Sequence, residues 1–123
     1  MITLLLKVLI VDDNRDVSEL LSIFLKKKGF DNVIINDSKI ALDHVKQEKY
    51  DVMVLDISMP EVSGIDIIKT LEKEKILQDQ KIIILSAVAF TSQEVNDLLE
   101  KEGIHSCLKK PVRLNELLTA IAS

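Results

Sequence analysis

Five short apolar runs recur along the chain, and each is followed by a stretch with apolar residues at every third or fourth position. The runs are rich in Val, Ile and Leu without polar alternation, which is typical of strands buried on both faces. The stretches between them have the spacing of helices with one apolar face. Strand and helix therefore alternate five times, which predicts a parallel sheet with helices on both sides and right-handed crossovers. We expect the strands at residues 4–11, 32–36, 50–56, 81–86 and 104–108.

Capping residues mark the expected helices as clearly as the periodicity does. Asn14 is suited to begin the first helix, and Gly29, which follows three lysines, is suited to end it. Asp37 or Ser38 would cap the second helix, and the third should run to about residue 74. Residues 91–94, Thr-Ser-Gln-Glu, fit a capping box at the start of the fourth. The apolar faces expected against the sheet are Val17, Leu20, Leu21, Phe24 and Leu25; Ala41, Leu42 and Val45; Ile65, Ile68 and Leu71; Val95, Leu98 and Leu99; and Leu114, Leu117, Leu118 and Ile121.

Composition narrows the functional classes without naming one. At 123 residues the chain is long enough for a single domain, 1–123, with a core of its own. Aromatic residues make up 3% of it and Trp is absent, which argues against a stacking platform for single-stranded nucleic acid. A net charge of -4 argues against direct contact with nucleic acid or an anionic membrane.

The compartment is suggested by the cysteine count and by the first residues. Cys107 has no second cysteine to pair with, which suits a reducing compartment. The apolar residues at the start lack a basic n-region and a small-residue cleavage site. No stretch approaches the roughly 18 apolar residues of a transmembrane helix. We therefore expect a cytoplasmic protein without a membrane partner.

The most informative polar residues stand at the expected carboxyl ends of the strands: Asp12 and Asp13, Asp56, Ser86 and Lys110. Open parallel sheets bind ligands beyond this edge. Three carboxylates there would repel one another without a cation, and Mg²⁺ prefers such oxygens while leaving room for phosphate. A carboxylate can also be the nucleophile that forms an acyl phosphate, with a lysine and a hydroxyl to neutralise the phosphoryl oxygens.

Plainer explanations exist for each of these residues. Asp12 and Asp13 could be N-cap residues of the first helix, and Asp56 could only cap a strand end. Ser86 is the least distinctive, because small polar residues often end strands, and Lys110 could be a solvated turn lysine.

Together, the set resembles the receiver domain of two-component response regulators, of the chemotaxis-regulator kind. The motifs that carry the resemblance are Asp12-Asp13, Asp56 followed by Met59-Pro60 and Gly64, Ser86-Ala87 and Lys110-Pro111. They cover essentially the whole chain, in the order and spacing of the family. The resemblance implies a doubly wound α/β fold of the flavodoxin-like type, with strand order 2-1-3-4-5 and five helices on both faces.

The resemblance also assigns roles to residues. Asp56 would be the phosphoacceptor, and Mg²⁺, or Mn²⁺ in its place, would be held by Asp12, Asp13, Asp56 and the backbone carbonyl of Ser58. Ser86 would follow the phosphoryl group and Lys110 would be its counter-charge, with a cis bond between Lys110 and Pro111.

The partners implied are a sensor histidine kinase or phosphotransfer protein as donor, and an output protein or attached domain. The face formed by the fourth helix, fifth strand and fifth helix would act on the output. Such a chain promotes its own phosphorylation and dephosphorylation but is not a turnover enzyme.

Three positions depart from the family pattern. Cys107 stands where a Tyr or Phe normally moves with the switch, and we expect Phe90 to fill part of the missing volume. Ser58 and Val88 occupy the two positions that tune loss of the phosphoryl group, and neither is a strong positioner of water. We therefore expect a longer-lived phosphorylated form than with an amide and an acid there.

Three other functions fit the fold less well. A haloacid-dehalogenase-type phosphatase needs a second Asp where the chain has Ser58. A nucleotide or flavin binder needs a phosphate-cradling loop, and the three glycines, Gly29, Gly64 and Gly103, form neither usual motif. A docking module that works without phosphorylation remains if Asp56 does not react.

Overall fold

The computed structural model describes residues 6–87 and 91–123, which form a five-stranded parallel sheet in the order β2-β1-β3-β4-β5. Its strands are β1 (Lys7–Val11), β2 (Asp31–Ile35), β3 (Val52–Asp56), β4 (Ile82–Ser86) and β5 (Ile104–Lys109). Its helices are α1 (Arg15–Lys27), α2 (Ser38–Gln47), α3 (Gly64–Lys73), α4 (Ser92–Leu99) and α5 (Leu114–Ala122), with a 3-10 turn, η1, at Leu77–Asp79. The predicted fold class and strand order are confirmed.

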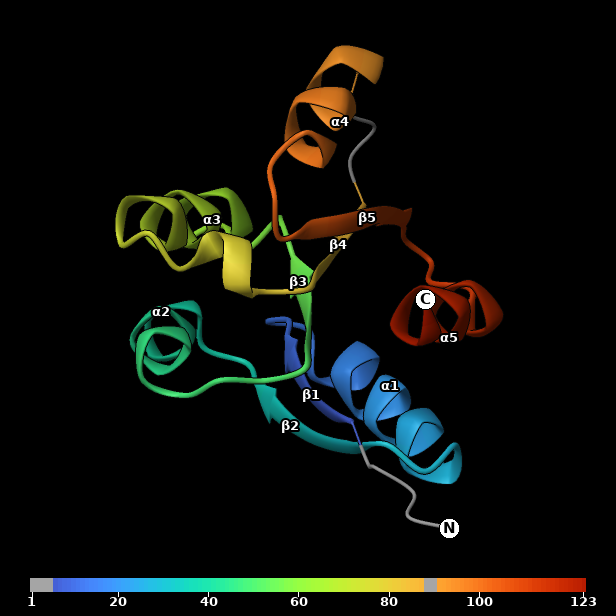
Figure 1. Ribbon diagram of the computed structural model, residues 1–123. Helices are drawn as coiled ribbons and strands as arrows, with labels where there is room; N and C mark the ends of the chain where they lie inside the picture. Colours follow the sequence, from blue (N-terminus) through green and yellow to red (C-terminus); the bar gives the residue numbers. More distant parts are fainter. Residues whose placement is uncertain (1–5, 88–90) are drawn as a thin grey trace, which may run out of the picture.

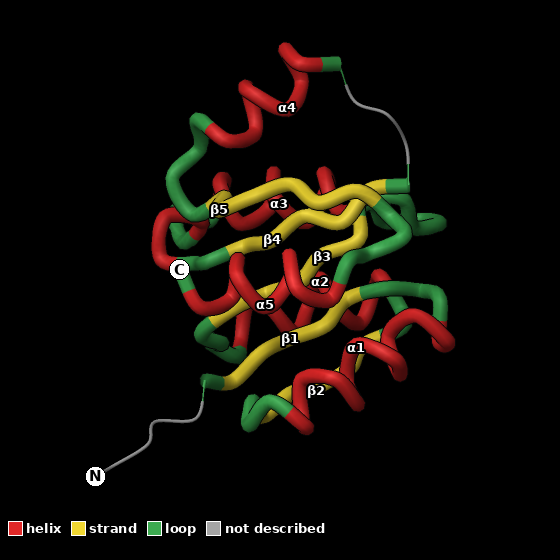
Figure 2. The backbone as a smooth tube through the Cα atoms, turned by 90° about the vertical axis from the view of Figure 1, so that its right-hand side faces the viewer, coloured by secondary structure: helices red, strands yellow, loops and turns green. Residues whose placement is uncertain are grey.

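The helices lie in two layers on opposite faces of the sheet. Helices α1 and α5 cover one face and α2 and α3 the other, while α4 lies beyond β5 (Figures 1 and 2). Each central strand contributes side chains to the core on both faces of the sheet, because successive side chains point to opposite faces. In β1, Val8 and Ile10 pack towards α1 and α5, whereas Leu9 and Val11 pack towards α2 and α3. This two-sided burial is why the strands are apolar throughout.

The capping signals in the sequence are confirmed. Asn14 caps α1 by accepting a hydrogen bond from the amide of Val17, and Asp37 caps α2. The capping box of α4 is present, and a second box begins α3 at Ser63. Gly29 follows α1 with φ +88, a backbone conformation that costs glycine little.

Two of the apolar side chains expected in the core are instead at the surface. Leu20 on α1 is 57% exposed and Leu99 on α4 is 41% exposed. In α1 and α4 the covered arc of the helix is narrower than the apolar spacing suggested, so a residue at the margin of the apolar stripe faces outward. Strand boundaries differ slightly as well: β3 begins at Val52 rather than residue 50, and β5 extends to Lys109.

None of the helices formed by residues 6–87 and 91–123 combines the length and apolar character needed to cross a membrane.

Candidate functional site

The polar strand-end residues converge because parallel neighbours end at the same edge of the sheet. Strands β1, β3 and β4 lie side by side, with Val11 in register with Leu55, and Asp56 with Leu85. Asp12 directly follows β1, Asp56 is the last residue of β3, and Lys110 directly follows β5. The structure therefore brings the predicted residues to one place from strands far apart in the sequence.

Three carboxylates form the centre of the site. Oxygen atoms of Asp12, Asp13 and Asp56 all lie within 4.8 Å of one another. Asp12 and Asp56 are 0% and 2% exposed, whereas Asp13 faces solvent. Two buried carboxyl groups and one open to solvent make a cluster that an ion or a phosphoryl donor can reach.

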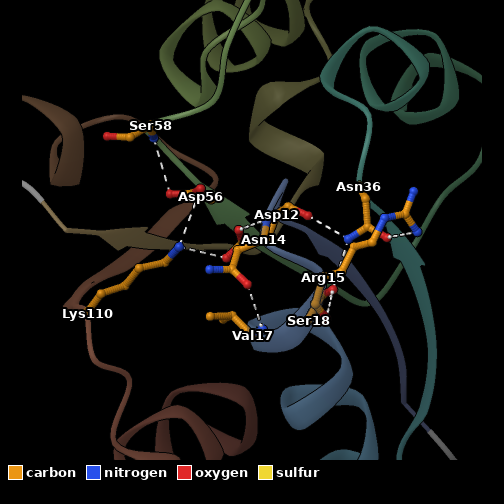
Figure 3. Close-up of polar contacts among 9 residues, drawn as sticks. All are labelled: Asp12, Asn14, Arg15, Val17, Ser18, Asn36, Asp56, Ser58 and Lys110. Carbon is orange, nitrogen blue, oxygen red and sulfur yellow. Dashed lines mark hydrogen bonds and ion pairs between the residues drawn. The ribbon is translucent and has the colours of Figure 1, made fainter.

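Lys110 lies between the two buried carboxylates (Figure 3). Its Nζ is 2.8 Å from Asp12 Oδ2 and 3.4 Å from Asp56 Oδ2. Its backbone amide donates to the carbonyl of Ser86 at 2.8 Å, which ties the turn after β5 to the end of β4. The bond from Lys110 to Pro111 is cis, as expected. Its neighbour Lys109 is exposed.

The electrostatics of the cluster raise the affinity of Asp56 for a proton. Burial, and then the charge of Asp12, raise the pKa of Asp56 to about 6, against the opposing effect of Lys110 and the Ser58 amide. Burial alone would lower the pKa of Lys110, but its interactions with Asp12 and Asp56 raise it above its ordinary value. Near neutral pH Asp56 is therefore mostly ionised, and Lys110 is charged.

Backbone amides fix the orientation of both buried carboxyl groups. The amide of Asn14 donates to Asp12 Oδ1 at 2.9 Å, and the amide of Ser58 donates to Asp56 Oδ1 at 3.2 Å. Asn14, rather than either aspartate, is the N-cap of α1. The plainer interpretation of Asp12 and Asp13 as N-caps is therefore wrong.

The chemistry of these oxygens fits a hard divalent cation. Asp12 Oδ2 is buried, and among the described residues its cationic partner is Lys110, whose Nζ lies 2.8 Å away. Converging carboxylate oxygens are ligands that Mg²⁺ prefers. A cation there would relieve the repulsion from Asp12 that, after burial, raises the pKa of Asp56.

Other residues predicted from the sequence, Ser86 and Cys107, are located by their strands. Ser86 is buried at the end of β4. Cys107 is half-buried in β5, opposite Ile84, and packs against the core on the α2 and α3 side. Burial raises the pKa of its thiol. Val88 and Phe90 lie outside the described residues, and so does the expectation that Phe90 compensates for Cys107.

Sequence reasoning missed the polar residues at the end of β2. Asn36 contacts Asp12 and Ser18, and Ser38 contacts the loop after Asp56 (Figure 3 for Asn36). The signal was available, since Asn36 follows an apolar strand as Asp12 follows another. Small polar residues often end strands, however, so the sequence alone does not distinguish Asn36 and Ser38 from ordinary loop residues.

Comparisons with known proteins agree with this geometry. The family described as the response regulator receiver domain matches residues 8–122. The DNA-binding response regulator MtrA of Mycobacterium tuberculosis is 31% identical over 115 residues, covering 94% of this chain and 48% of MtrA. The CAI-1 autoinducer sensor kinase/phosphatase CqsS of Vibrio cholerae is 26% identical over 95% of this chain and 17% of its own length.

A solved structure gives the same result in three dimensions. The receiver domain of the Francisella response regulator 1452 has a TM-score of 0.84 and 31% identity, over 95% of this chain and 93% of that one. The chain spans about half the length of the first curated relatives that it matches. On the strength of the family match and these likenesses, the chain belongs to the response regulator receiver domains, the phosphorylation switches of two-component signalling.

Proposed function

We propose that residues 1–123 form one receiver domain in which Asp56 accepts a phosphoryl group and thereby changes the surface offered to a partner. The observation that carries this proposal is the convergence of Asp12, Asp13 and Asp56 around Lys110. Asp56 is the natural acceptor because it is the most central of the three, at the end of the middle strand of the sheet.

The donor in this proposal is a phosphohistidine on a sensor histidine kinase or a phosphotransfer protein. A carboxylate oxygen of Asp56 attacks phosphorus, an O–P bond forms, and the P–N bond to the imidazole breaks. The imidazole leaves with that electron pair and takes a proton from solvent. The attacking group must be ionised, and a pKa of about 6 leaves Asp56 largely so at neutral pH.

The carboxylates of Asp12, Asp13 and Asp56, with the backbone carbonyl of Ser58, would hold Mg²⁺ or Mn²⁺. Such an ion supplies charge that offsets the repulsion between the carboxylates and the incoming phosphoryl oxygens. Lys110 already lies within ion-pairing distance of two of these carboxylates. Turning its Nζ to the phosphoryl oxygens neutralises charge that develops during transfer.

The switch itself rests on Ser86 and Lys110. The phosphoryl group draws both side chains towards Asp56 and so favours one of two states of the domain. The hydrogen bond from the Lys110 amide to Ser86 links the ends of β4 and β5, and thus the α4, β5 and α5 face. We propose that this face regulates an output protein or an attached domain. With Cys107 in place of an aromatic ring, either other side chains carry the conformational change to this face, or the face changes less.

The chain accepts and loses its phosphoryl group without turning over an external substrate. By sequence position, Ser58 and Val88 match the two family residues that position a hydrolytic water, and neither side chain type is suited to that task. The phosphorylated form therefore persists longer than with an amide and an acid there. Decay of the adduct, followed by intact mass, measures this directly. Rapid decay that is unchanged in Val88→Glu would contradict it.

The proposal is tested by incubating the chain with Mg²⁺ and a small acyl phosphate and then recording its intact mass. We expect one phosphoryl adduct that disappears with EDTA and in Asp56→Asn. Asp43→Asn, a matched change at an exposed position on α2, should keep the adduct. No adduct on the wild-type chain, or an undiminished adduct in Asp56→Asn, would overturn the proposal.

A further inference from the structure

The carboxyl end of β2 supplies no carboxylate to the cluster, yet its residues contact both acidic loops. One contact reaches the turn that carries Asp12 and Asp13, and the other reaches the loop that follows Asp56. Two residues make them: Asn36, directly after β2, and Ser38, the first residue of α2.

Asn36 fixes the backbone of Asp12. Its Nδ2 donates to the Asp12 carbonyl at 2.7 Å and to Ser18 Oγ at 2.9 Å (Figure 3). Ser18 is fully buried and in turn donates to the carbonyl of Arg15 at 3.1 Å. The amide of Asp12 donates to Ile35 at 3.2 Å. Asp12 is thus hydrogen-bonded to the end of β2 through both its N–H and its C=O.

Ser38 fixes the second loop in the same manner. Its hydroxyl, in a side chain that is 5% exposed, donates to the carbonyl of Pro60 at 2.8 Å. An exposed ion pair from Lys39 to Glu61, at 3.3 Å, joins the same two segments and adds little. Pro60 lies four residues after Asp56, in the loop that also carries Ser58.

A cavity of about 320 Å³ lies where these segments meet. Asp13 lines it from one loop, Pro60 and Glu61 from the other, and Asn36 and Ser38 from the segment between β2 and α2. Because the cavity separates the two loops, they do not pack directly against each other there. The hydrogen bonds of the segment between β2 and α2 therefore hold the loops in place against the repulsion of the carboxylates beside the cavity.

We propose that Asn36 and Ser38 form a brace that holds the two acidic loops at the spacing a divalent cation needs. Both are positioning residues, since neither offers an atom to the carboxylate cluster. Groups that orient metal ligands in this way strengthen binding, and their loss typically weakens metal affinity about 10- to 100-fold. The inference rests on the proposed function, because it takes the carboxylates to be cation ligands.

The chain contains a matched control for Asn36. Asn32, within β2, pairs with Ser22 on α1: its Oδ1 accepts from Ser22 Oγ at 2.6 Å and its Nδ2 donates to the Ser22 carbonyl at 3.3 Å. Asn32→Ala therefore removes a similar link between α1 and β2, but one that lies four residues before Asn36 in the sequence and joins Ser22 rather than Asp12. A general loss of stability should affect both variants, and a loss of positioning only Asn36→Ala.

The test is an amide chemical-shift titration with Mg²⁺ on the wild-type chain, Asn36→Ala, Asn32→Ala and Ser38→Ala, with thermal unfolding in EDTA recorded for each. We expect Asn36→Ala to bind Mg²⁺ about tenfold more weakly, and Asn32→Ala to bind as the wild type does. Ser38→Ala should also weaken binding. In Ser38→Ala the Pro60 carbonyl still accepts a hydrogen bond from the Val62 amide, so it is not left unpaired. This variant therefore provides the test if Asn36→Ala does not fold.

Wild-type affinity in Asn36→Ala and Ser38→Ala would overturn the brace while leaving the proposed function intact. Equal weakening in Asn36→Ala and Asn32→Ala would also overturn it, by showing an effect of stability alone. A wild-type chain that does not respond to Mg²⁺ would refute the proposed function, and the brace with it.

Discussion

Asp56 is buried beside Asp12, and Lys110 forms ion pairs with both carboxylates. Burial and the neighbouring charge make its ionised form costly, so that the pKa is about 6 instead of the ordinary 3.8. The arrangement lowers the stability of the unliganded protein at neutral pH. It also prepares the site for a group that brings positive charge.

A pH-dependent stability follows from the pKa of Asp56. The folded state binds this proton more tightly than the unfolded state, so the contribution of Asp56 is most favourable below pH 4 and is lost as pH rises through about 6. In EDTA, the free energy of unfolding of Asp56→Asn, relative to that of the wild type, should therefore increase by about 1–3 kcal/mol between pH 4.5 and 7.5. Thermal unfolding at the two pH values measures this. A constant difference, or an equal gain in Asp43→Asn, would contradict it.

Lys110 and Lys109 are adjacent in sequence but differ in what they contact. Lys110 offsets the charge of two buried carboxylates, whereas Lys109 is exposed. At pH 7.5 in EDTA, Lys110→Gln should lose about 3 kcal/mol of stability, because it removes the cation that pairs with the buried Asp12 and Asp56. Lys109→Gln should stay within about 0.5 kcal/mol of the wild type. Adding Mg²⁺ should reduce the difference in stability between Lys110→Gln and the wild type. Equal losses of stability in Lys110→Gln and Lys109→Gln would contradict the role given to Lys110.

At the scale of elements, the site depends on how closely α3 approaches the end of β3. A Cβ on Gly64 would lie 2.5 Å from the carbonyl oxygen of Asp56 and 2.8 Å from Ile57 Cα. The amide of Gly64 also donates to the Ile57 carbonyl at 3.0 Å. A side chain at Gly64 would therefore displace the backbone of the phosphoacceptor itself.

Two glycine variants separate this effect from backbone strain. Gly64→Ala should cost about 1–3 kcal/mol through overpacking and should also slow formation of the phosphoryl adduct. Gly29→Ala should cost about 1–2 kcal/mol, because φ is +88 there, and leave adduct formation unchanged, since nothing lies within 4 Å of the added Cβ. Unfolding midpoints and time courses of intact mass provide both measurements. Normal adduct formation in Gly64→Ala would show that its contact with Asp56 does not matter.

The elements also show what sequence reasoning captures well. Strand identity and helix starts were predicted because they depend on local chemistry, such as the Asn14 cap and the Thr91 capping box. Leu20 and Leu99 were placed wrongly because helical spacing does not reveal how wide an arc the sheet covers. The contact of Asn36 with Asp12 depends on the register of two strands joined through a helix, which no local pattern contains.

At the scale of the whole molecule, the strand ends unite residues 12 to 110 in one site, while the helices differ in how firmly they are held. Helix α4 lies beyond β5 and has one buried residue, Leu98, whereas α3 buries Ile67, Ile68 and Leu71 (Figure 2). Few buried apolar contacts mean a low free energy of local opening. The helix at the proposed output face is thus the one best able to change.

Amide hydrogen exchange tests this distribution of stability. In the unphosphorylated chain, amides of α4 should exchange faster than those of α3. On phosphorylation, exchange should change in α4, β5 and α5 and remain nearly constant in α2, which lies on the other side of the sheet from α5. Changes confined to α2 would place the output face elsewhere.

The central claim is that Asp56, and neither Asp12 nor Asp13, carries the phosphoryl group. Borohydride reduces an aspartyl phosphate to an alcohol, and trypsin separates the candidates, since residues 8–15 contain Asp12 and Asp13 and residues 50–69 contain Asp56. After incubation with Mg²⁺ and an acyl phosphate, we expect the reduced residue in peptide 50–69, assigned to Asp56 by fragmentation and absent with EDTA. Reduction in peptide 8–15, or at Asp51 or Asp66 within peptide 50–69, would contradict the claim.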